Sequence, residues 1–328
     1  MAVVVDELIA GLERGERRAL ARLLTVAEDG RPEQLREVIG ALYPRTGNAR
    51  VIGITGSPGV GKSTLTNAIA GRFRREGRSV AILAVDPSSP FSGGALLGDR
   101  VRMQGHHADA DVFIRSMASR GHLGGLSFAT PQAVLVLDAA GFDDIIVETV
   151  GVGQSEVEIA ATADTTVVAI APGMGDGVQA AKAGILEVAD LFVINKADHS
   201  GAGKLESELR GMLEMGHATA GPDDPAGWWP LIVRTVAVRD EGLDEVMEAF
   251  EAHGRHLDES REREQRIRAR ALHTIREIAL EQVRLRFARL GEGHDPLLEA
   301  LAGKVAARDL DPYTAADELL DALDGGTA

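Results

Sequence analysis

The segment GSPGVGKST at residues 56–64 constrains the fold of this chain more than any other stretch. It matches the pattern G-x-x-x-x-G-K-[ST] in full, follows an apolar run that ends at Ile54, and precedes the helix-forming LTNAIAGRFRR. A strand, a glycine-rich loop and a helix in this order form a Walker A phosphate loop, because backbone N–H groups and the helix N-terminus then point at phosphate oxygens. The segment therefore predicts an α/β domain that binds a nucleotide.

We expect the whole loop to contact the nucleotide phosphates. The Lys62 ammonium is expected to reach the β- and γ-phosphates, and the Ser63 hydroxyl to bind Mg²⁺. MinD-type ATPases carry a second lysine where this chain has Ser57, so the sequence disfavours that class. The candidate phosphate-binding residues are Gly56, Ser57, Pro58, Gly59, Val60, Gly61, Lys62, Ser63 and Thr64.

Seven short runs rich in valine and isoleucine predict strands. Most are continuous rather than alternating, as expected of strands buried on both faces of a mainly parallel sheet. Helical stretches lie between most of them, which predicts a doubly wound α/β fold. The predicted strands are 50–55, 79–85, 111–115, 143–148, 165–170, 190–194 and 231–236.

Helical patterns flank these strands and divide the chain into three expected parts. Residues 1–46 are expected to form an N-terminal helical extension, residues 47–250 the P-loop domain, and residues 251–328 a C-terminal helical region. Within 259–290 an apolar stripe runs along a highly charged helix. This helix could pack on its own domain or serve as a dimerisation arm. The stripe consists of Ile267, Ala271, Ile275, Ala279, Val283 and Phe287.

Composition narrows the class of partner. The 328 residues carry 35 basic and 50 acidic side chains, a net charge of −15, which argues against nucleic acid or an anionic membrane as the main partner. The absence of cysteine excludes disulfides and thiolate metal sites and fits a reducing cytoplasm. No run of about 18 apolar residues occurs, and the first residues lack a signal-peptide pattern, so we expect a cytoplasmic protein.

The segment NKAD at 195–198 follows the apolar run LFVI and fits the guanine-reading motif N-K-x-D. The Asp198 carboxylate can accept hydrogen bonds from N1–H and N2–H₂ of guanine. Adenine lacks this donor pair, so its entry would leave a buried carboxylate unpaired. We expect the Lys196 stem to cover the base and Asn195 to tie the motif to the phosphate loop. Ala237, in the later segment TVAVRDEGLDEV, is a further candidate contact to the base.

Three acids are candidates for metal binding and catalysis. Glu148 follows the apolar run in DDIIVE, and Asp86 ends the predicted second strand, at the sheet edge where ligands bind in such folds. Asp99 lies at the end of the Gly-, Ser- and Pro-rich segment that follows. Mg²⁺ prefers oxygen ligands and keeps several waters, so Ser63 with one or two of these acids suffices. Lys62, Glu148 and Asp86 are the candidate catalytic residues; each acid could instead be a helix cap or a solvated loop residue.

The residue after Gly151 is Val152, where many self-sufficient GTPases carry the glutamine that orients water. Gln154 is two residues further on. We therefore predict slow intrinsic hydrolysis that a partner accelerates. A glycine-rich segment, PGMGDGVQAAKAG, follows a later predicted strand and carries Gln179 and Lys182; it is either a further switch or a plain connection.

These motifs together resemble those of the MeaB-like GTPases, the family that includes the methylmalonic aciduria type A protein. The resemblance spans nearly the whole chain. The segments that carry it, in family order, are GSPGVGKST, VDPSSPFSGGALLGDR, IRSMASRGHLGGLS, GFDDIIVETVGVGQSE, APGMGDGVQAAKAG and NKAD.

The resemblance implies more than the residues do by themselves. It implies a GTPase chaperone of an adenosylcobalamin-dependent acyl-CoA mutase, most often methylmalonyl-CoA mutase, in which GTP hydrolysis gates cofactor loading and release. It implies a homodimer held largely by C-terminal helices, and switch loops that contact the mutase. It accounts for Glu148, because this group of GTPases has glutamate in the second acidic motif, and it places Lys182 in a third switch. TVAV is less typical of the last guanine loop than Ser-Ala, so Ala237 fits the family less closely.

Three other functions remain open at this point. A kinase associated with arginine/ornithine (LAO/AO) transport is the main alternative, since bacterial members of the family were often labelled so, but an ATP-dependent kinase needs no guanine reader. A metal-delivery GTPase would be expected to carry His-rich or Cys-containing sites. A scaffold that binds nucleotide without hydrolysing it would not need Lys62, Ser63 and Glu148.

Overall fold

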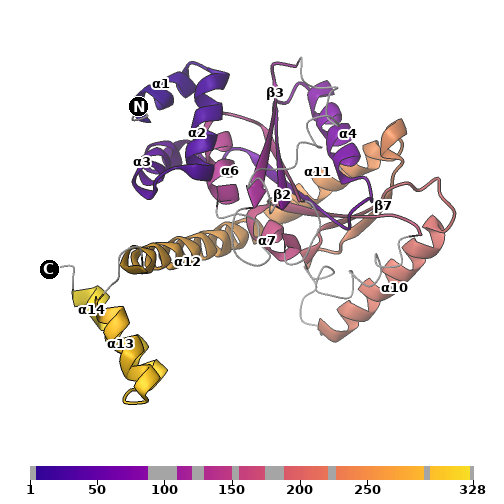
Figure 1. Cartoon of the computed structure of the whole chain (residues 1–328). Helices are drawn as coiled ribbons and strands as arrows, with labels where there is room; N and C mark the ends of the chain where they lie inside the picture. Colours follow the sequence, from indigo (N-terminus) through magenta and orange to yellow (C-terminus); the bar gives the residue numbers. More distant parts are fainter. Residues whose placement is uncertain are drawn as a thin grey trace. The chain divides into compact units, whose positions relative to one another are not determined.

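A computed structural model describes residues 5–87, 109–119, 129–149, 155–173, 188–220, 227–291 and 296–325 of the chain. The chain divides into two compact units, Met1–Arg270 and Ala271–Ala328. The first unit contains a sheet with helices on both faces (Figure 1). Among the described residues, no helix is both long enough and apolar enough to cross a membrane.

The sheet has seven strands in the order β3-β2-β4-β1-β5-β6-β7, and every described pairing is parallel. All seven predicted strands are present, which confirms the doubly wound α/β fold. Their ends differ by a few residues: β3 continues to Ser119, and β7 stops at Arg234. The strands are β1 Arg50–Thr55, β2 Val80–Pro87, β3 Val112–Ser119, β4 Asp144–Thr149, β5 Thr165–Ile170, β6 Leu191–Ile194 and β7 Leu231–Arg234.

Helices cover both faces because the central strands are apolar on both. On one face lie α4 (Lys62–Arg75) and α11 (Leu243–Glu259), which form one core with Ile52 and Ile54 of β1. On the other face lie α6 (Ala129–Ala139), α7 (Ser155–Thr162) and α10 (Ala202–Ala220). The central strands therefore contribute side chains to two cores, as their unbroken apolar sequences predict.

The N-terminal helices pack over α6, and α2 also contacts β3 at the edge of the sheet. These are α1 (Val5–Glu13), α2 (Arg17–Asp29) and α3 (Pro32–Leu42), followed by a short 3₁₀ helix, η1 (Tyr43–Arg45). Leu23 and Leu24 of α2 are fully buried in the core that α6 and the sheet share. An ion pair of 2.7 Å between Arg115 of β3 and Glu28 of α2 also links the helices to the edge of the sheet.

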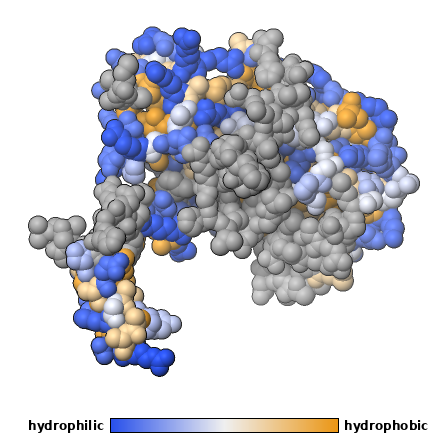
Figure 2. Space-filling model, in the orientation of Figure 1, coloured by the Kyte–Doolittle hydropathy of each residue, from blue (hydrophilic) through white to orange (hydrophobic). Residues whose placement is uncertain are grey.

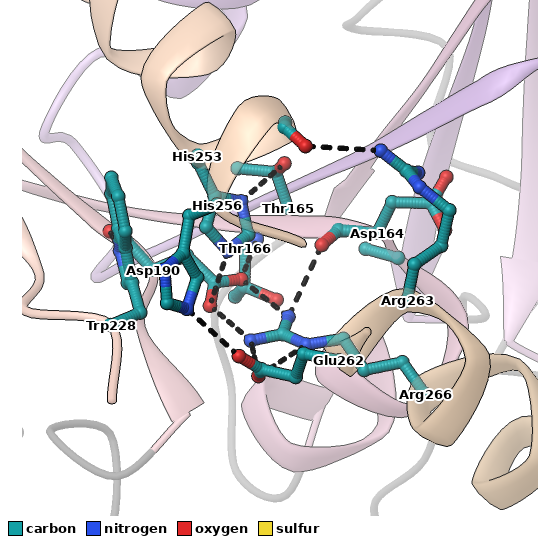
Figure 3. A network of polar contacts seen from close by, with 12 residues as sticks. Asp164, Thr165, Thr166, Asp190, Trp228, His253, His256, Glu262, Arg263 and Arg266 are labelled. Carbon is teal, nitrogen blue, oxygen red and sulfur yellow. Dashed lines mark hydrogen bonds and ion pairs between the residues drawn. The ribbon is translucent and has the colours of Figure 1, made fainter. Parts of the chain in front are cut away.

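A buried polar network fastens the C-terminal helices of the first unit to the start of β6 (Figure 3). The Asp190 carboxylate accepts a hydrogen bond of 2.7 Å from the backbone N–H of Thr166, and Arg266 donates two more, of 2.7 and 3.0 Å. His253 Nε2 lies 3.3 Å from Asp190 Oδ1, and His253 Nδ1 lies 2.9 Å from the hydroxyl of Thr165. Burial alone would raise the pKa of Asp190, but the contacts from His253 and Arg266 lower it below its usual value.

Trp228, which precedes β7, packs against this network. Its indole N–H donates to the Asp190 carbonyl at 2.7 Å, and its ring packs on His253 and His256 with centroids 4.8 and 5.3 Å away (Figure 3). One turn beyond Arg266 on α12, Arg270 pairs with Asp164 at 2.6 Å. The network therefore binds α11 and the first turns of α12 (Glu262–Gly291) to the sheet, at the end opposite the carboxyl ends of the strands.

The second unit is helical. It contains the later turns of α12, then α13 (Pro296–Ala307) and α14 (Pro312–Gly325), with Leu301 and Ala315 as its buried apolar residues in the described range. Apolar atoms lie between polar ones on the surface of α13 and α14 (Figure 2). Of the predicted stripe on α12, Ile267 is 55% and Ile275 65% exposed. Both interpretations of the stripe, packing on its own domain or a dimerisation arm, stay predictions.

Candidate nucleotide site

The candidate residues converge because parallel strands end at the same edge of the sheet. The phosphate loop follows β1, Glu148 lies near the end of β4, Asn195 follows β6, and Ala237 lies shortly after β7. In α/β sheets of this type, ligands bind in the crevice outside the carboxyl ends of the strands. The fold thus gathers segments that are far apart in the sequence at one edge.

Two glycines of the phosphate loop occupy positions that no other residue fits. Gly56 has φ 139°, and a Cβ there would lie 2.1 Å from the Ala169 carbonyl oxygen. Gly61 has φ 94°, and its Cβ would lie 2.6 Å from Asn195 Nδ2. The glycines therefore let the loop pass close to β5 and to the guanine motif before α4 begins at Lys62.

The Lys62 ammonium is folded back onto its own loop. It donates to the Gly56 carbonyl at 2.7 Å and to the Ser57 carbonyl at 3.2 Å, and the residue is only 6% exposed. Both acceptors belong to the loop that would surround a phosphate chain. The charge therefore lies inside the predicted cradle.

Ser63 and Glu148 meet directly. The Ser63 hydroxyl donates to Glu148 Oε1 at 2.6 Å, and Glu148 is 3% exposed. The pairing of β1 with β4 causes this contact, because it sets Ile54 beside Glu148. A hydroxyl and a carboxylate are the hard oxygen ligands that Mg²⁺ prefers, so the residues present fit this ion.

The other two predicted metal acids are described less completely. The backbone of Asp86 lies near the end of β2, as predicted, and β2 pairs with β4. The side chain of Asp86 and the whole of Asp99 lie outside the described residues. Within the described part of the chain, no three His, Asp or Glu side chains form a cluster that could hold a metal. The metal-binding roles of Asp86 and Asp99 stay predictions.

Asn195 joins the phosphate loop to the last predicted guanine loop. Its Nδ2 donates to the Val60 carbonyl at 2.9 Å. Its Oδ1 accepts from the Thr235 hydroxyl and from the backbone N–H of Ala237, each at 3.2 Å. The predicted tie between the motif and the cradle is present, and it also includes Ala237, which is 5% exposed.

Lys196 and Asp198 complete the guanine motif that begins at Asn195. Lys196 has φ 56°, a left-handed conformation that costs energy for a residue with a side chain, and its Nζ donates to the Gly59 carbonyl at 2.7 Å. The Ala197 N–H donates to the Thr235 carbonyl at 3.0 Å, which fixes the backbone beside Asp198. The Asp198 side chain is 36% exposed. The motif is thus held against the loop while its carboxylate stays accessible.

The loop after β7 adds a residue that the sequence motifs do not indicate. Arg239 ends the short helix η4 (Ala237–Arg239), and its Nη2 lies 3.4 Å from Asp198 Oδ2. Val238 beside it is 78% exposed. Arg239 lies in the segment TVAVRDEGLDEV, in which the sequence singled out only Ala237, and its proximity to Asp198 is what identifies it.

Other predicted residues lie outside the described part of the chain. These are Val152 and Gln154, on which the prediction of slow hydrolysis rests, and Gln179 and Lys182 of the possible further switch. Their roles stay predictions.

Comparison with known proteins supplies the family. The sequence profile of the family described as methylmalonyl-CoA mutase-associated GTPase MeaB matches residues 20–291. The profile covers most of the chain, including the phosphate loop, Glu148 and the guanine motif.

Individual relatives agree with this match. A Pyrococcus abyssi protein, named provisionally as a GTPase, is 46% identical over 98% of this chain and 98% of its own length. The mouse mitochondrial methylmalonic aciduria type A homolog is 34% identical over 75% of this chain and 62% of its own length. A crystal structure titled as an LAO/AO transport system kinase superimposes with a TM-score of 0.67, at 29% identity, over 99% of both chains.

Proposed function

This chain belongs to the MeaB family of methylmalonyl-CoA mutase-associated GTPases, and we propose that it is a GTP-hydrolysing chaperone of an adenosylcobalamin-dependent acyl-CoA mutase. Methylmalonyl-CoA mutase is the proposed partner, because the family description names it. The mouse relative's name, which refers to methylmalonic aciduria, supports the same assignment.

The observation that best supports a guanine nucleotide is the position of Asn195. Its amide bridges the Val60 carbonyl of the phosphate loop and the N–H of Ala237, so the loops that would hold phosphates and base form one unit. Asp198 follows three residues later with an accessible carboxylate. A carboxylate at this place favours guanine, because only guanine offers two adjacent donors.

The residues of the cradle have distinct proposed tasks in hydrolysis. Lys62 would exchange its contacts with the Gly56 and Ser57 carbonyls for contacts with phosphate oxygens. Ser63 and Glu148, with Asp86 and Asp99 as further candidates, would hold Mg²⁺, which neutralises charge on the β- and γ-phosphates when bound. Water attacks the γ-phosphorus, the bond to the bridging β–γ oxygen breaks, and GDP and phosphate leave.

We propose that the partner regulates hydrolysis, because Val152 stands where many GTPases carry the glutamine that orients this water. Val152 has no polar group to do so, and we propose that the mutase completes the site or reorders the segment that carries Gln154. Groups supplied by a partner accelerate related reactions by roughly 10³–10⁵-fold. GTP would hold the switch segments in one arrangement and hydrolysis would release them, which gates the passage of cobalamin.

We also propose that the protein works as a homodimer. Exposed apolar side chains continue along α12 beyond the two noted above, with Leu272 59%, Leu280 45% and Val283 42% exposed. Other exposed apolar side chains lie on α13 and α14: Leu297, Leu298, Tyr313 and Leu320. Exposed apolar side chains on these helices support an interaction surface there, and a second copy of this chain is its proposed occupant.

A cofactor-transfer assay tests the chaperone proposal. Purified apo-mutase from the same cell is mixed with adenosylcobalamin and this protein, and loading is followed by the change in the cobalamin absorption spectrum. GTP is expected to change the rate or extent of loading, and a non-hydrolysable GTP analogue to trap one stage. Loading that is identical with GTP, with the analogue and without nucleotide contradicts the proposal.

A kinase associated with LAO/AO transport remains the second candidate, because a structure with that title matches over 99% of this chain. It predicts transfer of the γ-phosphate to a protein acceptor rather than to water. Incubation with γ-labelled nucleotide and the corresponding periplasmic binding protein separates the two. Label on the binding protein supports the kinase, whereas free phosphate alone supports the GTPase.

A further inference from the structure

A charged side chain outside the recognised motifs lies against the carboxylate that would read guanine. Arg239 Nη2 is 3.4 Å from Asp198 Oδ2, and the two side chains are 51% and 36% exposed. We infer that Arg239 is a specificity-positioning residue, which holds the Asp198 carboxylate in the orientation that accepts both guanine donors. The inference rests on the proposed binding of a guanine nucleotide.

The orientation of the Asp198 carboxylate needs a second contact to hold it. Its backbone is fixed through the hydrogen bond from Ala197 to Thr235, but an aspartate side chain still rotates about its own bonds. Within the described part of the chain, Arg239 is the one side chain in an ion pair or hydrogen bond with this carboxylate. A partly exposed carboxylate that is free to turn would present its two oxygens to the base only part of the time.

Arg239 is itself held in place. Its Nε lies 2.9 Å from Glu241 Oε1 and its Nη2 donates to Glu241 Oε2 at 3.5 Å, while the same Nη2 forms the ion pair with Asp198. A backbone bridge between Val236 and Glu241 closes the loop. Asp240, in the left-handed region at φ 58°, pairs with Arg75 of α4 at 2.7 Å. The helix that begins in the phosphate loop thus supports the loop that braces Asp198.

The brace leaves room for the base. An ionised carboxylate offers about four lone-pair sites on its two oxygens. Guanine would use two of them, so the ion pair with Arg239 and the base can occupy Asp198 simultaneously. Lysine cannot replace the arginine fully, because a single ammonium lacks the planar fork that spans Asp198 and Glu241.

The experiment measures equilibrium binding of GDP and ADP by isothermal titration calorimetry. The variants are R239A, R239K, D198N and the double variant R239A/D198N, each made in the full chain. R234A is the matched control, because Arg234 is 50% exposed and forms a similar ion pair, with Glu206 on α10. The melting temperature of each variant shows whether the fold is retained.

We expect R239A to weaken GDP binding roughly three- to fivefold, the effect of losing one partly exposed ion pair, and to leave ADP binding unchanged. R239K is expected to lie between R239A and the wild type, and R234A to match the wild type. In the D198N background the R239A change is expected to have no further effect on GDP binding, because the arginine acts through Asp198.

Five results would overturn the inference. Tighter GDP binding by R239A means that the arginine competes with the base. An equal loss for GDP and ADP means a general structural role, and an unchanged cost in the D198N background means that Asp198 is not the intermediary. If D198N itself leaves the preference for GDP intact, the guanine assignment fails, and with it the proposed function. If D198N weakens GDP binding and R239A does not, the role inferred for Arg239 is wrong, while the proposed binding of a guanine nucleotide stands.

Discussion

The Ser63 hydroxyl donates to the Glu148 carboxylate at 2.6 Å, although the two residues come from α4 and β4. The parallel pairing of β1 with β4 brings them together, since it sets Glu148 beside Ile54, shortly before the phosphate loop. The two strands thus place the hydroxyl and the carboxylate where both could bind one magnesium ion. Four predictions follow from this and the other contacts described above.

Replacing Glu148 by glutamine is expected to reduce GTP hydrolysis by roughly 100-fold, because a neutral amide holds Mg²⁺ poorly and leaves transition-state charge uncompensated. The rate should also need more Mg²⁺ to saturate. Phosphate release measured across a Mg²⁺ titration checks both effects. D143N is the control, because Asp143 precedes the same strand at its other end and binds Ser79. Wild-type rates and Mg²⁺ dependence in E148Q contradict the assigned role.

The K62A substitution is expected to weaken GTP binding by roughly 10- to 100-fold, since a hydrogen bond to a charged group contributes about 1.5–3 kcal/mol. Fluorescence titration with a labelled nucleotide measures it. Lys204, whose side chain is 82% exposed and lies on α10, supplies the control variant K204A. Equal affinities for K62A and K204A would show that the lysine does not reach the phosphates.

The D190N substitution is expected to lower the free energy of unfolding by about 3 kcal/mol at neutral pH, because it leaves Arg266 without its buried counter-ion. The pKa of Asp190 is lowered in the folded state. Its charge therefore stabilises the fold fully above its ordinary pKa of about 3.9, and this contribution is lost as the pH falls through the lower folded value.

Denaturant unfolding at pH 7, 5 and 3.5 checks this prediction. The difference between wild type and D190N should hold from pH 7 to 5 and shrink below pH 4. Asp244, on the surface with a side chain 73% exposed, provides the control D244N, for which about 0–1 kcal/mol is expected. A D190N difference that grows on acidification would contradict the assigned direction.

Replacing Ile275 by glutamate is expected to convert the proposed dimer to a monomer while leaving hydrolysis in the absence of mutase close to the wild-type rate. The charge would be buried in the apolar interface and destabilise it. Light scattering coupled to size-exclusion chromatography measures the mass. Y43E is the control, because Tyr43 is 60% exposed and lies in the N-terminal region. A wild type that is monomeric at all concentrations tested contradicts the proposed dimer.

The sequence predicted the sheet and the place of the phosphate loop because these depend on local patterns. Continuous apolar runs identified the strands, and the motif around Lys62 set the loop between β1 and α4. Strand order could not be read this way, since the pairing of β4 between β2 and β1 depends on contacts between distant residues.

The supporting contacts were less predictable for the same reason. The fold brings Arg239 next to Asp198, and no short sequence motif marks Arg239. The network of Asp190, His253 and Arg266 joins β6, α11 and α12, and each residue alone is an ordinary polar side chain in the sequence. The exposure of Ile267 and Ile275 likewise required the folded chain, because periodicity shows that a stripe exists but not what covers it.

Phosphate release from GTP and from ATP, with and without the adenosylcobalamin-dependent mutase of the same cell, tests the central claim most directly. We expect slow hydrolysis of GTP by this protein alone, little hydrolysis of ATP, and a marked acceleration of GTP hydrolysis when the mutase is added. A GTP rate that the mutase leaves unchanged, or an ATP rate equal to the GTP rate, would contradict it.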